Sequence, residues 1–463
     1  MRRYITYVFL LIIALNSVSI QHAQSQRDFS REVARKAPSW LRDGVIYEVF
    51  PRAFSQEGTF DGVTAKLDQL KELGVNIIWL MPIHPVGKDR RKGSLGSPYA
   101  VVDYYGINPD YGTKEDLKEL IAEAHKRDMK VIIDIVANHT AWDSVLMKTP
   151  EFYTRDQGGK IIPPVDEWTD VADLNYDNPK VRDYMIDMLK FWVRDYDLDG
   201  FRCDVAGMVP TDFWEKAREE LDKVKPDIMM LAEAEQPDLL VKAFDTDYSW
   251  RLLHGLNEVI AGGAPAVLLW DRLDEEKRRF PQGALRMRFS DNHDEIRAIA
   301  RLGQRGALAA SALMFTIDGV PLLYNGQEIG DTSESGAPAL FEKHLIVWQF
   351  RERRPEFLEF YKNIIKLRKT HSALRNGETI KIQNSDENRV ITFVRKDKTE
   401  ELLVAINFSN RPFIGFVETA NSAEFADVTP GVASVARAST LPSLSLGSYG
   451  FKIFRRELSP STR

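Results

Sequence analysis

The chain has 463 residues, of which 44% are hydrophobic and 28% are charged, proportions typical of a soluble globular protein with room for more than one domain. Its formal net charge of −6 argues against a nucleic-acid or anionic-membrane partner. A single cysteine excludes an internal disulfide, so the folded state depends on its core.

The first 25 residues have the pattern of a secretory signal. Arg2 and Arg3 precede an apolar run at residues 7–15, and Ala23 and Ser25 stand two apart, as small residues do at a signal-peptidase site. The alternative is an uncleaved membrane anchor, for which the apolar run is short. We therefore predict a signal peptide at residues 1–25, a secreted or periplasmic mature protein, and no membrane attachment after cleavage.

Residues 26–376 alternate between short apolar runs and amphipathic helical stretches. Strands are expected at residues 44–50, 76–81, 129–136, 200–205, 228–232, 285–290 and 320–324, and helices at 63–73, 114–127, 181–196, 212–223 and 306–316. A further strand belongs near residues 242–258, without defined bounds. This alternation implies parallel strands and an α/β fold, a (β/α)₈ TIM barrel. No glycine-rich dinucleotide fingerprint follows the first strand, which argues against an open doubly wound sheet.

Two segments depart from this alternation. Residues 141–178 are a long insertion after the third strand, rich in Pro, Asp and Gly, and such a loop is usually functional or a small subdomain. From residue 377 to residue 463, strand-like runs at 379–384, 389–396, 402–408 and 450–455 have no helices between them. This part is predicted to be a C-terminal all-β domain, a β-sandwich.

The stretch DYDLDGFRCDVAGM, residues 195–208, allows two interpretations. Its opening D-x-D-x-D-G matches the start of an EF-hand calcium loop, but the twelfth position, which should be a bidentate Glu, is Ala206. The alternative is a strand at 200–205, on which Arg202 and Asp204 share one face and Cys203 is a buried apolar residue on the other. We favour the strand, preceded by a solvated turn that contains Asp195, Asp197 and Asp199.

Polar side chains collect where four of the predicted strands end. They are Asn138 and His139 after the third strand, Arg202 and Asp204 on the fourth, Glu233 after the fifth, and His293 and Asp294 after the seventh. Any one of them could be a structural ion pair. A barrel would bring all of them together at the end where such folds carry their chemistry.

The segments DIVANHT, GFRCDVAGM, MMLAEAE and FSDNHDE resemble, in the same order, the four signature regions of the α-amylase family of glycoside hydrolases. WLMPIHPVG, SPYAVVDYYGINPDYGT, VADLNYDNP and PLLYNGQEIG resemble further segments of that family, so the resemblance runs from about Trp40 to the C-terminal domain. It implies a retaining hydrolase of α-1,4 bonds whose partner is an α-glucan such as starch, glycogen or a maltodextrin.

The resemblance also implies residue roles. Asp204 would be the nucleophile and Glu233 the general acid and then base, the two carboxyl groups that a retaining glycosidase needs. Asp294 would stabilise the distorted sugar. Four residues are expected to bind substrate: Tyr99, as a stacking platform under the cleaved sugar, Arg202, and the histidines His139 and His293, which are expected to be neutral near pH 7.

Calcium is the one cofactor that the resemblance suggests. Asn138 and Asn175 match positions that ligate calcium in many members, but both side chains are neutral and a hard cation prefers carboxylates. We expect a weak calcium site or none. After the nucleophile the family often has Lys and His, whereas this chain has Gly207 and Met208, which leaves its subsite preference open.

Three functions are alternatives to an α-amylase-like hydrolase. An α-glucosidase, a cyclomaltodextrinase-like hydrolase or an α-glucanotransferase would use the same chemistry. A non-catalytic carbohydrate-binding relative would usually lack the three carboxylates, which are all present here. A metal-dependent barrel enzyme would need a ligand cluster such as HExxH, which the sequence lacks. The sequence does not distinguish endo from exo action, and it does not give the oligomeric state.

Overall fold

The computed structural model describes residues 27–431, 437–438 and 440–458. The predicted signal peptide, residues 1–25, lies outside this part of the chain. Within it, no helix combines the length and the apolar character needed to cross a bilayer.

Eight parallel strands close into a barrel, which confirms the predicted TIM fold. Around the barrel they are β1 (Ile46–Val49), β10 (Val320–Tyr324), β9 (Leu285–Arg288), β8 (Thr246–Tyr248), β7 (Met229–Ala232), β6 (Gly200–Cys203), β3 (Lys130–Ile135) and β2 (Ile77–Leu80). Apart from Lys130, every residue of these strands is buried, because parallel strands are covered on both faces. A cluster that includes Ile46, Trp79, Ile132 and Leu231 packs together among them.

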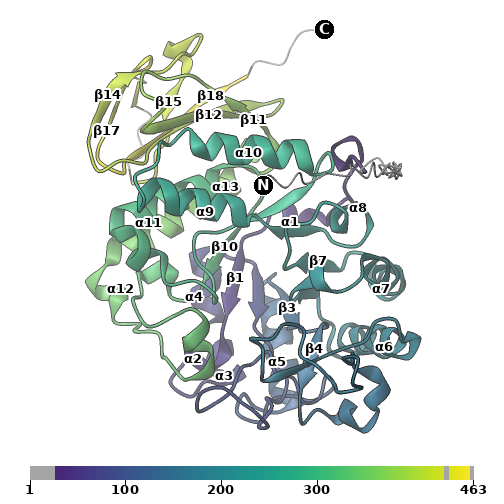
Figure 1. Cartoon of the computed structure of the whole chain (residues 1–463). Helices are drawn as coiled ribbons and strands as arrows, with labels where there is room; N and C mark the ends of the chain where they lie inside the picture. Colours follow the sequence, from purple (N-terminus) through teal and green to yellow (C-terminus); the bar gives the residue numbers. More distant parts are fainter. Residues whose placement is uncertain (1–26, 432–436, 439, 459–463) are drawn as a thin grey trace, which may run out of the picture.

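Helices surround the barrel (Figure 1). The longer ones are α5 (Lys114–Lys126), α6 (Pro179–Tyr196), α7 (Thr211–Val224), α9 (Trp250–Ile260), α10 (Leu268–Arg279), α11 (Ala298–Thr316) and α13 (Pro355–Thr370). The shorter ones are α1 (Ser39–Arg42), α2 (Pro51–Phe54), α3 (Phe60–Thr64), α4 (Leu67–Leu73), α8 (Leu239–Lys242), α12 (Phe350–Arg353) and α14 (Ser372–Asn376). A capping box between Thr113 and Asp116 starts α5. The predicted helix at 63–73 is two helices, α3 and α4, and α4 ends at Gly74 with φ of 103°.

Two barrel strands differ from their predicted form. The strand that had no defined bounds is β8, which has only three residues, and its sequence Thr-Asp-Tyr lacks an apolar run. The strand predicted at 200–205 ends at Cys203, and Val205 adopts φ of 36°. The cysteine itself is buried and free, as predicted.

The prediction that Asp199 lies in a solvated turn is wrong. Its side chain is 1% exposed and accepts hydrogen bonds from His125, Lys130, Lys225 and the backbone N–H of Val131. These donors hold the pKa of Asp199 well below its usual range despite burial, which alone would raise it. The carboxylate therefore fastens the start of β6 to the neighbouring β3.

The C-terminal part consists of antiparallel sheets, which confirms the all-β prediction. One sheet has the order β11 (Glu378–Lys381), β12 (Val390–Lys396), β13 (Glu400–Asn407), β18 (Phe451–Glu457), β15 (Ala426–Asp427) and β16 (Arg437–Ala438). The other pairs β14 (Phe413–Phe416) with β17 (Ser443–Leu446). A buried cluster that includes Val394, Leu403, Phe413 and Leu444 packs the two sheets together.

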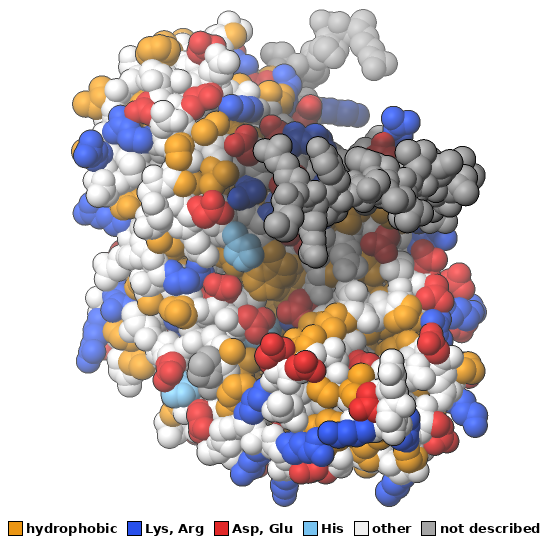
Figure 2. Space-filling view, viewed as in Figure 1, with side chains coloured by type: hydrophobic (Ala, Val, Ile, Leu, Met, Phe, Trp, Pro, Cys, Tyr) orange, Lys and Arg blue, Asp and Glu red, His pale blue; other side chains and the backbone are white. Residues whose placement is uncertain are grey.

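The two ends of the barrel have different neighbours. In Figure 1 the C-terminal sheets and α10 lie at the top, whereas α2 and β4 lie at the bottom. The insertion forms a small antiparallel pair, β4 (His139–Ala141) with β5 (Val171–Asp173), and two short turns of 3₁₀ helix, η2 (Val145–Lys148) and η3 (Pro150–Phe152). On the face shown in Figure 2, acidic and basic side chains are intermingled.

Candidate active site

A cleft of about 270 Å³ lies at the carboxyl ends of the barrel strands. Six of the predicted site residues line it: Tyr99, His139, Asp204, Glu233, His293 and Asp294. They come from the loops after β2, β3, β6, β7 and β9, which lie far apart in the sequence. Closure of the barrel therefore brings the predicted catalytic and sugar-binding side chains to one place, at the end of the barrel where folds of this kind carry their active sites.

The Arg202 guanidinium links the carboxylates below the cleft. This side chain is fully buried on β6, and its Nη1 lies 2.9 Å from Asp134 Oδ1 and 2.9 Å from Asp204 Oδ1. Its Nη2 lies 2.8 Å from Glu233 Oε1. One planar cation thus contacts three acids, one on β3 and two that directly follow β6 and β7. It fixes Asp204 and Glu233 relative to each other.

Burial sets the protonation of these acids. Removal from water raises the pKa of Asp204 to about 6 and that of Glu233 to about 7, while Arg202 opposes both shifts. The side chains are 9% and 14% exposed, so each still reaches the cleft. Near pH 6.5 this arrangement favours one ionised and one protonated carboxyl group, the pair that acid-assisted nucleophilic displacement requires.

The backbone after β6 is strained beside these acids. Val205 has a positive φ of 36°, which is uncommon for a β-branched residue. In this conformation its N–H donates a 2.7 Å hydrogen bond to Glu233 Oε2. The turn therefore aims a backbone donor at the second oxygen of Glu233, whose first oxygen faces Arg202.

His293 stands in a chain of charged groups, and the prediction that it is neutral near pH 7 is wrong. Its Nδ1 lies 2.5 Å from Oε1 of the buried Glu48 on β1, and its Nε2 lies 3.2 Å from Asp294 Oδ2. Asp294 and Glu48 outweigh burial and raise the pKa of His293 to about 9. The side chain is an imidazolium at neutral pH, and it holds Asp294 at the rim of the cleft.

Tyr99 packs on His293. The two rings stack with their centroids 5.4 Å apart and an angle of 21° between their planes. The Tyr99 hydroxyl lies 2.7 Å from His293 Nε2 and donates to Asp134 Oδ2 at 3.1 Å. These contacts lock the ring at the base of the cleft, where it is 9% exposed.

His139 differs from His293 because its one acidic neighbour among the described residues that raises its pKa, Asp170, does not outweigh burial. Burial lowers the pKa of His139 to about 4, so this imidazole is neutral at pH 7, as predicted. Its ring packs edge-on against Trp168 of the insertion, with centroids 5.5 Å apart. A neutral imidazole that lines the cleft can both donate and accept hydrogen bonds with hydroxyl groups.

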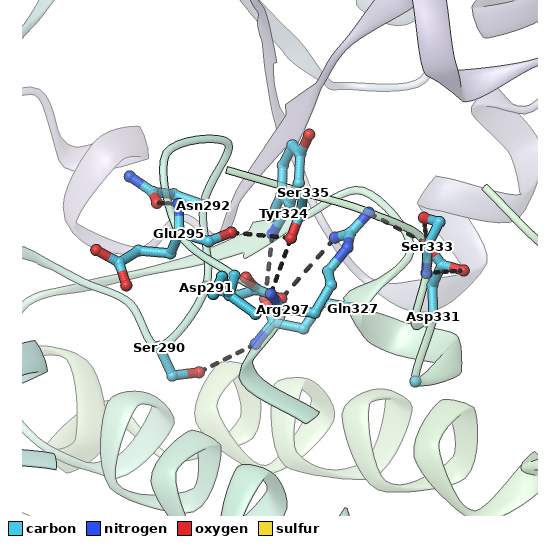
Figure 3. A network of polar contacts seen from close by, with 12 residues as sticks. Ser290, Asp291, Asn292, Glu295, Arg297, Tyr324, Gln327, Asp331, Ser333 and Ser335 are labelled. Carbon is cyan, nitrogen blue, oxygen red and sulfur yellow. Dashed lines mark hydrogen bonds and ion pairs between the residues drawn. The ribbon is translucent and has the colours of Figure 1, made fainter. Parts of the chain in front are cut away.

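The loop after β9 is held by a polar network around Arg297 (Figure 3). Arg297 Nη2 lies 3.2 Å from Asp331, its Nη1 lies 3.8 Å from Asp291, and its guanidinium lies 4.3 Å from the Tyr324 ring centre. The Arg297 N–H donates to the Ser335 hydroxyl at 2.8 Å. The network ties residues 291–297, which carry His293 and Asp294, to the loop after β10.

The insertion supplies one wall of the cleft. Lys92, in the loop after β2, lies 2.9 Å from Asp170 and donates to the Glu167 carbonyl at 2.9 Å. Trp168 and Asp170 line the cleft next to it, and Leu340 and Phe341 line it from the loop after β10. The cleft is therefore lined by the insertion and by apolar side chains of the loop after β10.

A family model described as the alpha-amylase catalytic domain matches residues 27–156 and 166–350. The chain belongs to the alpha-amylase family.

Known proteins of this family resemble the chain along most of its length. Alpha-amylase MalA of Haloarcula japonica is 29% identical over 404 residues, which cover 81% of this chain and 57% of MalA. A cyclomaltodextrinase of Geobacillus thermopakistaniensis is 27% identical and covers 91% of this chain and 78% of its own. The solved structure of a maltogenic alpha-amylase, AmyB, of Thermotoga neapolitana is 33% identical with a TM-score of 0.81, and the match covers 90% of this chain and 100% of that one. The chain thus spans little more than half the length of MalA.

The positions that suggest calcium in alpha-amylase family members do not fit a hard cation here. The Asn175 side-chain oxygen accepts from the Asp177 N–H at 3.0 Å, and the Asn138 amide nitrogen lies 3.3 Å from His139 Nδ1. In the described part of the chain, no group of three or more His, Cys, Asp and Glu side chains is placed to hold a metal ion. Calcium prefers several carboxylate oxygens, so no step of the reaction is assigned to it.

Two acids of this alpha-amylase family site were assigned no role from the sequence. Glu48 lies in the apolar strand β1 and Asp134 in the apolar strand β3, and both are completely buried. A charged residue inside an apolar run is the pattern that could have identified them, because burial of an unpaired charge is costly. Neither lines the cleft, and both act on residues that do.

Proposed function

We propose that the protein is a secreted, retaining alpha-amylase-type hydrolase that cleaves α-1,4 bonds of starch, glycogen or maltodextrins by double displacement. The observation that carries the proposal is the pairing of Asp204 and Glu233 on the two Nη atoms of one buried guanidinium, at the carboxyl ends of adjacent strands. This supports one nucleophile and one proton donor that face the same substrate bond.

In the first half of the reaction, Glu233 donates its proton to the glycosidic oxygen. The bond between that oxygen and the anomeric carbon breaks while Asp204 forms a bond to the same carbon. The raised pKa of Glu233, about 7, supports its role as a proton donor near neutral pH. Arg202 keeps Asp204 oriented for attack.

In the second half, the ionised Glu233 takes a proton from water. The water oxygen attacks the anomeric carbon and the bond to Asp204 breaks, so two inversions return the α configuration. Asp294, fixed by His293, is placed to hydrogen-bond the hydroxyls of the distorted sugar. Tyr99 is placed to stack under that sugar, and the neutral His139 to hydrogen-bond it.

A cyclomaltodextrinase-like hydrolase, an α-glucosidase or an α-glucanotransferase is the second candidate. It is favoured by the similarity to a named cyclomaltodextrinase and a named maltogenic alpha-amylase. The same two carboxyl groups would act as nucleophile and as acid and base in these enzymes. In a transferase, a sugar hydroxyl would take the place of water in the second half of the reaction. Secretion is proposed from the N-terminal sequence pattern alone.

Replacing the proton donor tests the assignment. Glu233→Gln is expected to lower kcat on maltotriose by about 10²–10⁴-fold, since general acid catalysis is worth that much. With α-maltosyl fluoride, whose leaving group needs little protonation, the first displacement should be largely retained. Glu219→Gln, which changes an exposed glutamate on α7, is the matched control and should leave both rates unchanged. Near-normal turnover of maltotriose by Glu233→Gln would overturn the proposal.

A further inference from the structure

A second cavity, of about 430 Å³, lies away from the cleft at the other end of the barrel. Its walls come from α10, from residues 281–288 at the start of β9, from Asp318 and Gly319 before β10, and from the C-terminal sheet. In Figure 1, α10, which supplies several of the lining residues, lies below β11 and β12. None of the residues that line the catalytic cleft lines this cavity.

Basic side chains outnumber acidic ones around this cavity. Six are basic, namely Arg42, Lys277, Arg286, Arg288, Arg375 and Arg395, and two are acidic, namely Glu276 and Asp318. Two of the arginines have close acidic partners, because Arg286 pairs with Asp247 and Arg288 pairs with Glu276.

The other cations are poorly neutralised. In the part of the chain that the structure describes, Arg42, Lys277 and Arg395 have no carboxylate within ion-pair distance, and Arg375 has only Asp43, at 3.3 Å. These side chains come from α1, α10, β12 and α14. Arg288, Arg395 and Lys277 together hold the pKa of Asp318 low against its burial, so one carboxylate is shared among several cations. Lys277 is exposed and Arg42 and Arg375 are partly exposed, so water solvates these three, whereas Arg395 is buried. The excess of cations over carboxylates is one that a bound anion would neutralise.

Among these four cations, Arg395 has the charge that is hardest to accommodate, because it is the most deeply buried. It is fully buried, and it donates to the carbonyls of Thr316 and Gly377 at 3.0 and 2.7 Å. The first of these carbonyls lies at the end of α11, where the helix dipole offers only partial negative charge. Its Nε is buried without a hydrogen-bond partner in the described residues. Burial lowers the pKa of Arg395 to about 10, although Asp318 opposes this shift.

We propose that this cavity binds phosphate, either free or as the ester of a small sugar. Guanidinium groups bind the oxygens of phosphate through pairs of parallel hydrogen bonds. Phosphate as a dianion can also neutralise more than one cation. The cavity is larger than the catalytic cleft, so an organic group has room beside the anion. Because Arg395 belongs to the C-terminal sheet and Lys277 to the barrel, bound phosphate fastens the two together. The proposal does not depend on the glycosidase assignment.

The test follows the melting temperature and the heat of binding of the mature protein with inorganic phosphate, against chloride at equal ionic strength. At ten times its Kd, phosphate is expected to raise the melting temperature by about 2 °C in a saturable manner. Glucose 6-phosphate and glucose are the further ligands. Tighter binding of the ester than of inorganic phosphate identifies a sugar phosphate as the ligand, and equal or weaker binding identifies free phosphate.

Variants separate a site from a general salt effect, since phosphate also stabilises proteins by exclusion from their surface. Arg42→Gln with Lys277→Gln should weaken phosphate binding at least tenfold and leave starch turnover unchanged. Lys36→Gln with Arg278→Gln removes the same charge from exposed positions outside the cavity and should bind as the native protein does. If the double variant folds poorly, the single variant Lys277→Gln replaces it in the test and should also weaken phosphate binding. An equal rise in melting temperature in every variant, or no saturable binding, would overturn the proposal.

Discussion

Single buried side chains set the protonation states in the cleft. Burial raises the pKa of Asp204 to about 6 and that of Glu233 to about 7, and both groups contact Arg202. The proposed reaction needs Asp204 ionised and Glu233 protonated. Activity should therefore rise as the pH passes the pKa of Asp204 and fall as it passes the pKa of Glu233.

The pH dependence of kcat/KM is the first prediction at this scale. A bell-shaped profile is expected, with its maximum between about pH 6 and 7. Its two limbs report the pKa values of the two carboxyl groups in the free enzyme. In Glu233→Gln, assayed with α-maltosyl fluoride, the alkaline limb should disappear because no titrating proton donor remains. An alkaline limb that persists unchanged in this variant would assign that limb to another group.

Glu48 acts together with Asp294 to keep His293 charged, although Glu48 does not line the cleft. Its Oε1 lies 2.5 Å from His293 Nδ1, and Glu48 raises the pKa of that imidazole. Glu48→Gln keeps the shape but removes the charge, so the pKa of His293 should fall by about one unit or more. NMR titration of the imidazole, assigned with His293→Gln, measures it. An unchanged His293 pKa in Glu48→Gln would mean that Asp294 alone holds the proton.

At the scale of elements, the loop after β9 depends on Arg297 to present His293 and Asp294. Arg297→Met leaves the buried Asp291 and Asp331 without their cation, which should lower the free energy of unfolding by about 3–5 kcal/mol. The kcat/KM should fall as well, because the loop loses its anchor. Arg305→Met, at an exposed position on α11, is the control and should change the unfolding free energy by less than about 0.5 kcal/mol. Equal stability of the two variants would show that the network in Figure 3 does not hold the loop.

The elements that the sequence predicted well are those with strong apolar runs. Strands such as β2 and β3 are buried on both faces, so their sequences are nearly continuous in Ile, Val and Leu. β8 was not placed because its Thr-Asp-Tyr sequence is short and polar, and Arg286 pairs with its aspartate inside the barrel. The helix predicted at 212–223 starts one residue earlier, at Thr211, whose hydroxyl donates to Asp238.

The candidate site could be predicted only in part. Asp204, Glu233 and Asp294 sit at strand ends, where the resemblance and the barrel rule point to the same residues. The charge of His293 could not be predicted, because its partner Glu48 is 245 positions away in the sequence. The burial of Asp199 likewise depends on Lys225 and His125, which only the closed barrel brings together.

On the scale of the whole molecule, the two ends of the barrel carry different chemistry. Buried acids around one guanidinium lie at the carboxyl ends of the strands, and a cavity lined by more basic than acidic side chains lies at the opposite end beside the C-terminal sheet. The parallel order of all eight strands produces this division, because every strand points its carboxyl end the same way. The proposed catalytic site and the proposed phosphate site can therefore be altered independently.

The most direct test of the central claim is the anomeric configuration of the first product. Proton NMR would follow a maltooligosaccharide digest at early times, before mutarotation, and soluble starch would be digested in parallel to compare product sizes. Double displacement through Asp204 and Glu233 predicts that the newly formed reducing end appears first as the α-anomer. Initial formation of the β-anomer would contradict the account, since it would mean a single displacement by water without a covalent bond to Asp204.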